Sequence, residues 1–196
     1  NDRLCAYAPH GYDLVTDTDA AATPGYNRVE VIFDRIFEAG REKKTPVVVG
    51  EWGAYYMGGE YLQPALHIIG LIEQALAGQT YWAYWENIEK QDYFDKVFLR
   101  YYPMKTNGKL LRYNNDYNKG KFVIEWEESN TQSVSRIYVP SIDALKNSGL
   151  NLTPRSEITI IPIEASSSGY LEILPIGEKR KITIPLQMLN MPIQNQ

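Results

Sequence analysis

The sequence predicts an α/β region over residues 1–100 and an all-β region over residues 101–196. Before residue 100, three apolar or aromatic segments recur about 40 and then about 30 residues apart, a spacing typical of βα units in a parallel sheet. After residue 101, short strands follow one another at intervals of roughly 10 residues without helices between them. That second pattern is typical of an antiparallel β-sandwich.

The most informative segment of the α/β region is residues 46–53, Pro-Val-Val-Val-Gly-Glu-Trp-Gly. A continuous β-branched run that ends in glycine predicts a strand buried on both faces. Glu51 then stands at the carboxyl end of that strand, where parallel barrels place their catalytic groups. The spacing alone leaves a second interpretation open, in which Glu51 caps a helix or pairs with an arginine.

Two further segments have the same relation to a strand end: residues 7–13, Tyr-Ala-Pro-His-Gly-Tyr-Asp, and residues 80–87, Thr-Tyr-Trp-Ala-Tyr-Trp-Glu-Asn. In a parallel barrel such ends converge on one face. The candidate site residues are therefore His10, Tyr12, Glu51, Trp82, Trp85 and Glu86. A carboxylate among these aromatic groups suits sugar chemistry, because an indole stacks on a pyranose face and a phenol that donates to the carboxylate holds it ionised.

Helices are predicted between these strands. Residues 27–44 show apolar side chains at i, i+3, i+4 and i+7, with Asn27 as the expected N-cap. Residues 62–77 form the second expected helix, with Leu76 directed inward and Gly78 as its stop. His67 on that helix is expected to be a packing or surface residue. The acidic loop over residues 14–25 is expected to contribute to a substrate rim.

The all-β region is divided by turn signals. Turns are expected at residues 114–116 and 118–120. Strands are expected at residues 110–113, 121–125, 135–139, 158–163, 171–174 and 181–185.

The three motifs resemble the last three strands of retaining glycoside hydrolases of family 5, in clan A. Residues 99–103, 122–126 and 137–140 resemble the C-terminal β-sandwich of endoglycoceramidases and their relatives. The resemblance implies the C-terminal part, strands 6 to 8, of a (β/α)8 TIM barrel, followed by an antiparallel β-sandwich domain. It also implies a nucleophilic role for Glu51, supporting catalytic roles for Tyr12 and His10, and a sugar subsite built around Trp85.

The family carries its general acid/base in an Asn-Glu-Pro motif, and no Asn-Glu dipeptide occurs in this chain. Retaining hydrolysis uses two carboxyl groups about 5–5.5 Å apart. We therefore expect the acid/base and strands one to five on a missing N-terminal part of the same enzyme, and near-inactivity of this chain alone. Glu86 is expected to contact substrate, although its type also suits acid/base work.

The resemblance implies a carbohydrate partner, a β-glucoside that carries a ceramide or sterol aglycone. An ordinary family 5 β-glucanase or β-glucosidase remains an alternative, because missing upstream loops shape the aglycone pocket. A non-catalytic carbohydrate-binding protein is the other alternative. Three barrel strands alone would leave open sheet edges, which disfavours an independent half-barrel.

Composition sets further bounds. The net charge of −4 argues against nucleic-acid binding. No apolar run reaches the roughly 18 residues of a membrane span. The single cysteine, Cys5, excludes an internal disulfide. No cofactor and no metal site is predicted, and the compartment stays open, with only a lean towards an extracellular or secreted one.

Overall fold

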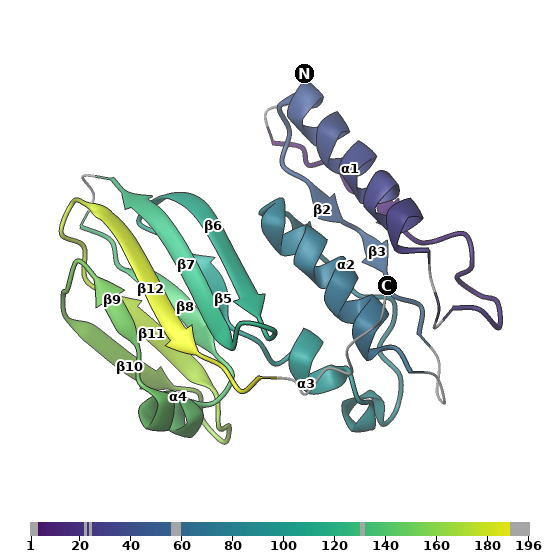
Figure 1. The fold of residues 1–196 in the computed structure, drawn as a ribbon. Coiled ribbons are helices and arrows are strands. Elements are labelled where there is room, and N and C mark those ends of the chain that lie inside the picture. Colours follow the sequence, from purple (N-terminus) through teal and green to yellow (C-terminus); the bar gives the residue numbers. More distant parts are fainter. Residues whose placement is uncertain (1–3, 22, 24, 56–59, 130–131, 189–196) are drawn as a thin grey trace. The chain divides into compact units, whose positions relative to one another are not determined.

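The computed structural model describes residues 4–21, 23, 25–55, 60–129 and 132–188. The chain divides into two compact units, Asn1–Leu99 and Arg100–Gln196. Unit 1 combines short parallel strands with helices, and unit 2 consists mainly of antiparallel sheets (Figure 1). The fold is therefore mixed and rich in sheet, with few helices.

Unit 1 contains three parallel chain segments that lie side by side. The middle segment holds β2 (Val48–Val49) and β3 (Glu51–Trp52), and pairs on one side with β1 (His10–Gly11) and on the other with β4 (Gly78–Gln79). Parallel bridges Tyr7–Val47 and Gly53–Trp82 extend the pairing beyond the short strands. Each connection between these segments contains a helix, as parallel pairing requires.

The first helix, α1 (Tyr26–Lys43), packs Val29, Phe33, Ile36 and Phe37 into the core of unit 1. Its N-cap is Gly25, which makes no side-chain cap bond, so the expected Asn27 cap is wrong. The cause is tertiary: Asp13 accepts a hydrogen bond from the Gly25 amide, at 2.9 Å, and so fixes where the helix begins.

The second helix, α2 (Leu62–Gln74), ends before the expected stop at Gly78. Leu76 lies beyond the helix in the left-handed region, with φ 55°, and its side chain is exposed. The chain must leave the helix there, because Gly78 is the first residue of β4. The expected inward orientation of Leu76 is therefore wrong. The shorter elements η1 (Ile88–Lys90) and α3 (Phe94–Val97) follow.

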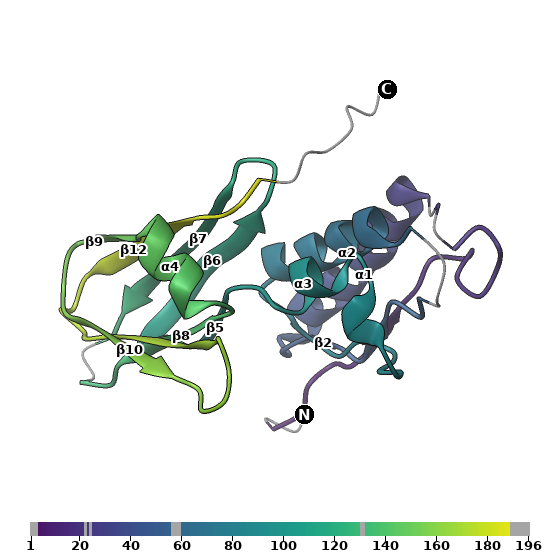
Figure 2. The ribbon, with the colours of Figure 1, turned by 90° about the horizontal axis from the view of Figure 1, so that it is seen from below.

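Unit 2 contains two four-stranded antiparallel sheets, seen as separate layers in Figure 2. One sheet has the order β10-β11-β8-β5 and the other β6-β7-β12-β9. The strands are β5 (Tyr102–Lys105), β6 (Gly108–Asp116), β7 (Lys121–Glu128), β8 (Ser135–Val139), β9 (Asn151–Thr153), β10 (Ile158–Pro162), β11 (Gly169–Ile173) and β12 (Lys179–Pro185). Inward residues of both sheets form one core, including Phe122, Trp126, Ile137 and Leu171.

The sequence missed three elements of unit 2: β5, β9 and the helix α4 (Ile142–Ser148). The helix begins at Ser141, whose Oγ accepts a hydrogen bond from the Ala144 amide at 3.2 Å. The turn expected at residues 114–116 is wrong, because β6 continues to Asp116 and the chain reverses over residues 117–120. The turn signal at residues 118–120 is thus the one that is used.

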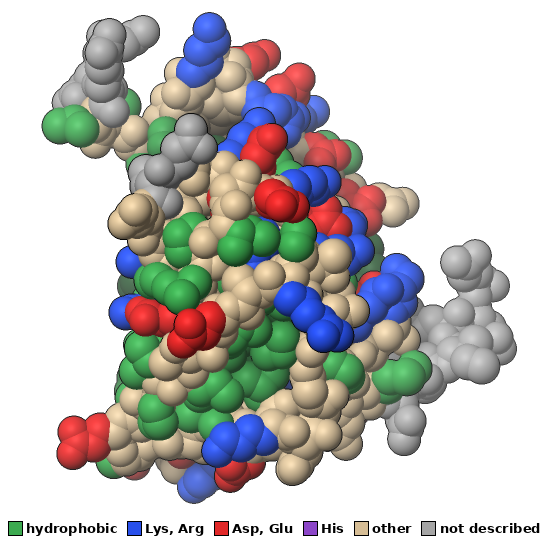
Figure 3. Space-filling view, turned by 90° about the vertical axis from the view of Figure 1, so that its left-hand side faces the viewer, with side chains coloured by type: hydrophobic (Ala, Val, Ile, Leu, Met, Phe, Trp, Pro, Cys, Tyr) green, Lys and Arg blue, Asp and Glu red, His purple; other side chains and the backbone are tan. Residues whose placement is uncertain are grey.

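Two surfaces of unit 2 differ in their chemistry. β10 is an edge strand without a charged residue, and its Ile158, Ile160 and Ile161 are only half-buried. Figure 3 shows hydrophobic side chains gathered on the side of unit 2 that carries β9 and β10, with charged side chains around them. On the outer face of the other sheet, Glu125 lies among the side chains of Arg112, Lys179 and Lys181.

Candidate active site

The centre of the candidate site is the Glu51 carboxylate on the middle segment of unit 1. Glu51 pairs in register with His10 of β1, and His10 Nδ1 lies 3.3 Å from Glu51 Oε2. The Glu51 side chain is 29% exposed, so it is accessible to a substrate while remaining within the protein surface. The strand continues one residue further than expected, to Trp52.

Tyr12 makes the second contact with Glu51. The Tyr12 hydroxyl donates a hydrogen bond to Glu51 Oε2, at 2.9 Å. The same carboxylate oxygen therefore faces both an imidazole nitrogen and a phenol. A hydrogen bond to the charged form of a carboxylate favours that form. The structure thus brings together His10, Tyr12 and Glu51, which the sequence placed on separate strand ends.

The residues that alternate with His10 and Tyr12 are buried on the opposite side, against α1. Gly11 has no side chain, and a Cβ there would lie 2.6 Å from Cζ of Phe33. The Asp13 carboxylate is almost fully buried and accepts hydrogen bonds from the amides of Leu14 and Gly25 and from Nε and Nη2 of Arg28. The sequence reasoning missed this contact, although an acid directly after Tyr12 and a basic residue in the first turn of the next helix were visible signals.

The pKa of Asp13 reflects this environment. Burial is the largest influence and by itself raises the pKa of the carboxyl. The hydrogen bonds from Arg28, Gly25 and Leu14, together with the charge of Arg28, outweigh burial and hold the pKa below its ordinary value. Asp13 is therefore a charged group inside unit 1 that is satisfied by its neighbours.

The two tryptophans of the third segment have different environments. Trp82 pairs with Gly53, just beyond Glu51, and its side chain is 53% exposed. Trp85 packs against the core of unit 1, and its Nε1 is shielded from solvent. Glu86 is exposed on the turn that follows, and in the described part of the chain no hydrogen bond or ion pair joins it to Glu51. The geometry therefore favours Trp82 over Trp85 as an accessible stacking surface.

Buried aromatic side chains lie behind the strand end that carries Glu51. Trp52 is fully buried, and its Nε1 donates to Gln79 Oε1 at 2.6 Å. Its ring meets Tyr81 edge-on, with the centroids 5.4 Å apart. Gly53 has φ 101°, and a Cβ there would lie 2.2 Å from the Tyr81 ring, so this position requires glycine. This packing fixes the backbone immediately after Glu51.

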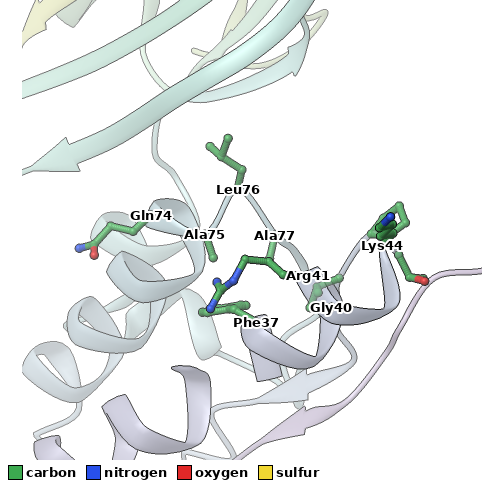
Figure 4. A pocket seen from close by; sticks show the side chains of 11 residues that line it. Phe37, Gly40, Arg41, Lys44, Gln74, Ala75, Leu76 and Ala77 are labelled. Atoms are coloured by element: carbon green, nitrogen blue, oxygen red, sulfur yellow. The ribbon is translucent and has the colours of Figure 1, made fainter. Parts of the chain in front are cut away.

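A hollow of about 590 Å³ lies elsewhere in unit 1, between the last turn of α1 and the segment after α2 (Figure 4). Its walls include Phe37, Arg41, Val47 and Leu76. Val47 precedes β2, whereas Glu51 lies at the other end of the same segment. The hollow is thus at the amino ends of the strands, away from Glu51.

Two features of the described residues bear on other kinds of site. Among them, no group of three or more His, Cys, Asp or Glu side chains is arranged to hold a metal ion. No helix among them is long and apolar enough to span a membrane. His67 stacks on Tyr26 with a centroid distance of 4.5 Å, and burial lowers its pKa. It lies between α1 and α2, as expected for a packing residue.

Comparison with known proteins gives one family match and several matches to solved structures. Residues 100–172 match the glycoside hydrolase family 5 C-terminal domain. No curated protein matches the chain. The matching solved structures have low sequence identity, so they show the fold alone.

Three of these structures illustrate the range. The lactosyl-enzyme intermediate of endo-glycoceramidase II from Rhodococcus sp. matches 95% of this chain with a TM-score of 0.67 and 14% identity, over 43% of its own length. An endogalactoceramidase matches 93% of this chain with a TM-score of 0.68 and 14% identity, over 42% of its length. Sterylglucosidase 1 of Cryptococcus neoformans matches 91% of this chain with a TM-score of 0.55 and 13% identity, over 38% of its length.

The chain thus spans less than half the length of the structures that it matches. The family match lies in unit 2, and the structural match extends over both units. The resemblance stated from the sequence is confirmed: the chain is similar to the C-terminal portion of endoglycoceramidase-like enzymes of glycoside hydrolase family 5.

Proposed function

We propose that this chain is the C-terminal portion of a retaining β-glycosidase in which Glu51 is the nucleophile. One observation carries the proposal: the Glu51 carboxylate lies at the end of the middle parallel strand and faces both Tyr12 and His10. A nucleophilic carboxylate must be ionised and held in position. The Tyr12 hydrogen bond supports both requirements.

The same proposal assigns the two units. Residues 1–100 form the last three βα units of a TIM barrel, and residues 101–196 form a C-terminal β-sandwich domain. The parallel order of the three segments in unit 1 and the two antiparallel sheets of unit 2 support this assignment. The match to 95% of this chain over 43% of the Rhodococcus enzyme supports it independently.

The chemistry requires a second carboxyl group. Glu51 attacks the anomeric carbon and forms a glycosyl ester, while an acid protonates the departing oxygen; water then cleaves the ester with that residue acting as base. We assign this acid/base to an N-terminal part of the same enzyme. The lactosyl-enzyme intermediate of the Rhodococcus relative supports a covalent route. General acid catalysis contributes about 10²–10⁴-fold, so this chain alone is expected to be nearly inactive.

The other site residues have graded roles. Tyr12 holds the nucleophile, and His10 donates to a sugar hydroxyl or orients the acid/base. Trp82 is exposed beside Gly53 and stacks on the sugar ring. Trp85 packs against the core of unit 1 and has a structural role. Glu86 contacts substrate at the rim. None of these roles uses a cofactor or a metal ion.

The proposed substrate class is a glycolipid of the glycosylceramide type. Two of the matching structures are named endo-glycoceramidase II and endogalactoceramidase, and a third is named sterylglucosidase 1. Other β-glucosides remain the alternative. Turnover of a glucosylceramide, a steryl glucoside and a β-glucan oligosaccharide, compared under one set of conditions, distinguishes these classes.

The activity itself is tested with Glu51→Gln in the full-length enzyme. Glutamine keeps the size of the side chain and removes the nucleophile, so kcat should fall by about 10⁴-fold or more while substrate binding, measured calorimetrically, changes little. Glu89→Gln is the matched control, since Glu89 is an exposed acid outside the candidate site, and it should retain most of the turnover. If Glu51→Gln retains substantial activity, the proposal is wrong.

A further inference from the structure

We infer that Asp13 is a positioning residue for Tyr12, and through it for Glu51; this inference rests on the proposed function. Within the described part of the chain, Asp13 makes no hydrogen bond or ion pair with Glu51. Its carboxylate instead fixes the backbone on the carboxyl side of Tyr12 to the beginning of α1.

Burial alternates along residues 10–13. His10 is exposed and Tyr12 half-buried, whereas Gly11 and Asp13 are buried. Successive side chains of an extended chain point to opposite sides. Gly11 and Asp13 therefore face α1, and His10 and Tyr12 face Glu51. Each contact of Gly11 or Asp13 with α1 consequently sets the position of Tyr12 between them.

The Asp13 carboxylate accepts four hydrogen bonds, two on each oxygen. Oδ1 accepts from the Leu14 amide at 2.7 Å and from Arg28 Nε at 3.0 Å. Oδ2 accepts from the Gly25 amide at 2.9 Å and from Arg28 Nη2 at 3.1 Å. Two donors on each oxygen, including both nitrogens of one guanidinium edge, determine the orientation of the carboxylate as well as its position.

The hydrogen bonds of Asp13 also bridge the loop that leads from β1 to α1. Asp13 precedes the long loop over residues 14–25, and Gly25 ends it as the N-cap of α1. The side chain therefore joins the two ends of this loop directly beside Tyr12. A shift of about 1 Å in a group that contacts the reacting atoms can cost up to about 100-fold in rate. The Tyr12–Glu51 bond of 2.9 Å has little tolerance for such a shift.

The test is Asp13→Asn in the full-length enzyme. The side-chain nitrogen of the asparagine must face two hydrogen-bond donors, whichever carboxylate oxygen it replaces. We expect kcat to fall by about 10- to 100-fold. KM should change little, because Asp13 acts on the position of the nucleophile and not on sugar binding.

Three further variants complete the design. Tyr12→Phe should also lower kcat, and Tyr12→Phe combined with Asp13→Asn should lower it no further than Tyr12→Phe alone, because both act through one hydrogen bond. Glu51 also faces His10, which stays in place in every variant. Asp34→Asn is the matched control, since Asp34 is an exposed acid of α1, the helix that Asp13 contacts. It should leave kcat and KM unchanged.

The outcomes separate this inference from the proposed function. Turnover that survives Glu51→Gln overturns the proposed function. Loss of turnover in Glu51→Gln together with an unchanged kcat in Asp13→Asn, or with additive losses in the double variant, overturns only the role of Asp13. If Asp13→Asn does not fold, Arg28→Gln removes two of the four bonds at a half-exposed position. A crystal structure of either variant with Tyr12 still 2.9 Å from Glu51 would also overturn the inference.

Discussion

The Tyr12 hydroxyl lies 2.9 Å from Glu51 Oε2, although 39 positions separate the two residues in the sequence. Parallel pairing of β1 with β3 produces this contact, because it places His10 opposite Glu51 and leaves Tyr12 two residues further along. His10 Nδ1 lies 3.3 Å from the same oxygen. One carboxylate oxygen is thereby held by two side chains, and in the proposed mechanism the carboxylate attacks the sugar.

Replacing Tyr12 by phenylalanine removes the hydroxyl and keeps the ring. A hydrogen bond to a charged group is worth roughly 1.5–3 kcal/mol, so kcat/KM should fall by about 10- to 100-fold in the full-length enzyme. Steady-state kinetics on an aryl β-glucoside measures this effect. Tyr84→Phe is the control, because the Tyr84 side chain is 81% exposed. Equal rates for wild type and Tyr12→Phe would exclude a role for the hydroxyl.

Alanine substitutions should separate the two tryptophans of the third segment. Trp82→Ala removes an exposed ring and should weaken sugar binding by on the order of 1–2 kcal/mol, with a change in folding stability below about 0.5 kcal/mol. Trp85→Ala removes a ring packed against the core and should destabilise folding by roughly 2–4 kcal/mol. Ligand titration and urea denaturation of both variants measure the two quantities. The opposite pattern would return the stacking role to Trp85.

Glu125 on β7 should make the stability of unit 2 depend on acid pH. The hydrogen bond from Arg112, and the charges of Lys181 and Lys179 beside it, lower the pKa of Glu125 from 4.5 to about 2 despite partial burial. A group whose pKa is lower in the folded state stabilises the fold above its unfolded value. That contribution is lost as the pH falls from 4.5 towards 2.

We expect this contribution to be about 1–2 kcal/mol, because the cationic partners are largely exposed and solvent screens the attraction. Urea denaturation at pH 6 and pH 3 measures it, and Glu125→Gln should lose less stability between the two values than wild type. Glu127→Gln is the control, since Glu127 is an exposed acid of the same strand. Identical pH dependence in all three proteins would contradict the assignment.

The ion pair between Arg180 and Glu128 is the most buried charged contact described in unit 2, with both side chains fully excluded from solvent. Glu128 also accepts the amides of Ile176 and Gly177, at 2.7 Å each. Arg180→Met leaves a buried carboxylate without its cation, so the free energy of unfolding should fall by about 3–5 kcal/mol.

Arg136→Met is the matched comparison for Arg180→Met, because Arg136 pairs with Glu172 at a partly exposed position. This substitution should cost less than about 1 kcal/mol. Urea denaturation of both variants gives the two values. Similar losses for the two substitutions would show that burial of the Arg180 pair does not determine its energetic weight.

The sequence predicted those features of the fold that depend on local pattern. The periodicity of residues 27–44 and 62–77 indicated both long helices, and the turn signal at residues 118–120 lies where the chain reverses. The errors fall where tertiary contacts decide. Asp13 sets the beginning of α1, and the start of β4 at Gly78 forces α2 to end early. Short elements such as β9 contain too few residues for a periodic signal.

In the candidate site, too, local pattern predicted some features and tertiary contacts decided the others. Residue types and spacing placed His10, Tyr12 and Glu51 near one another, since parallel strand ends share an edge. The exposed position of Trp82 and the core position of Trp85 could not be inferred, because the two residues differ only in which way the chain turns after the strand. The residue types of Asp13 and Arg28 were visible in the sequence, but their pairing across 15 positions depends on how the chain folds back after β1.

The central claim is that Glu51 forms the covalent bond to the sugar, and labelling with a 2-fluoro-β-glycoside tests it most directly. The fluorine slows hydrolysis of the intermediate, so the label accumulates on the nucleophile of the full-length enzyme. Peptide mapping by mass spectrometry should find the sugar on the peptide that contains Glu51, and the product should retain the β configuration. A label on Glu86 or Glu60, or an inverted product, would contradict both the nucleophile assignment and the retaining mechanism.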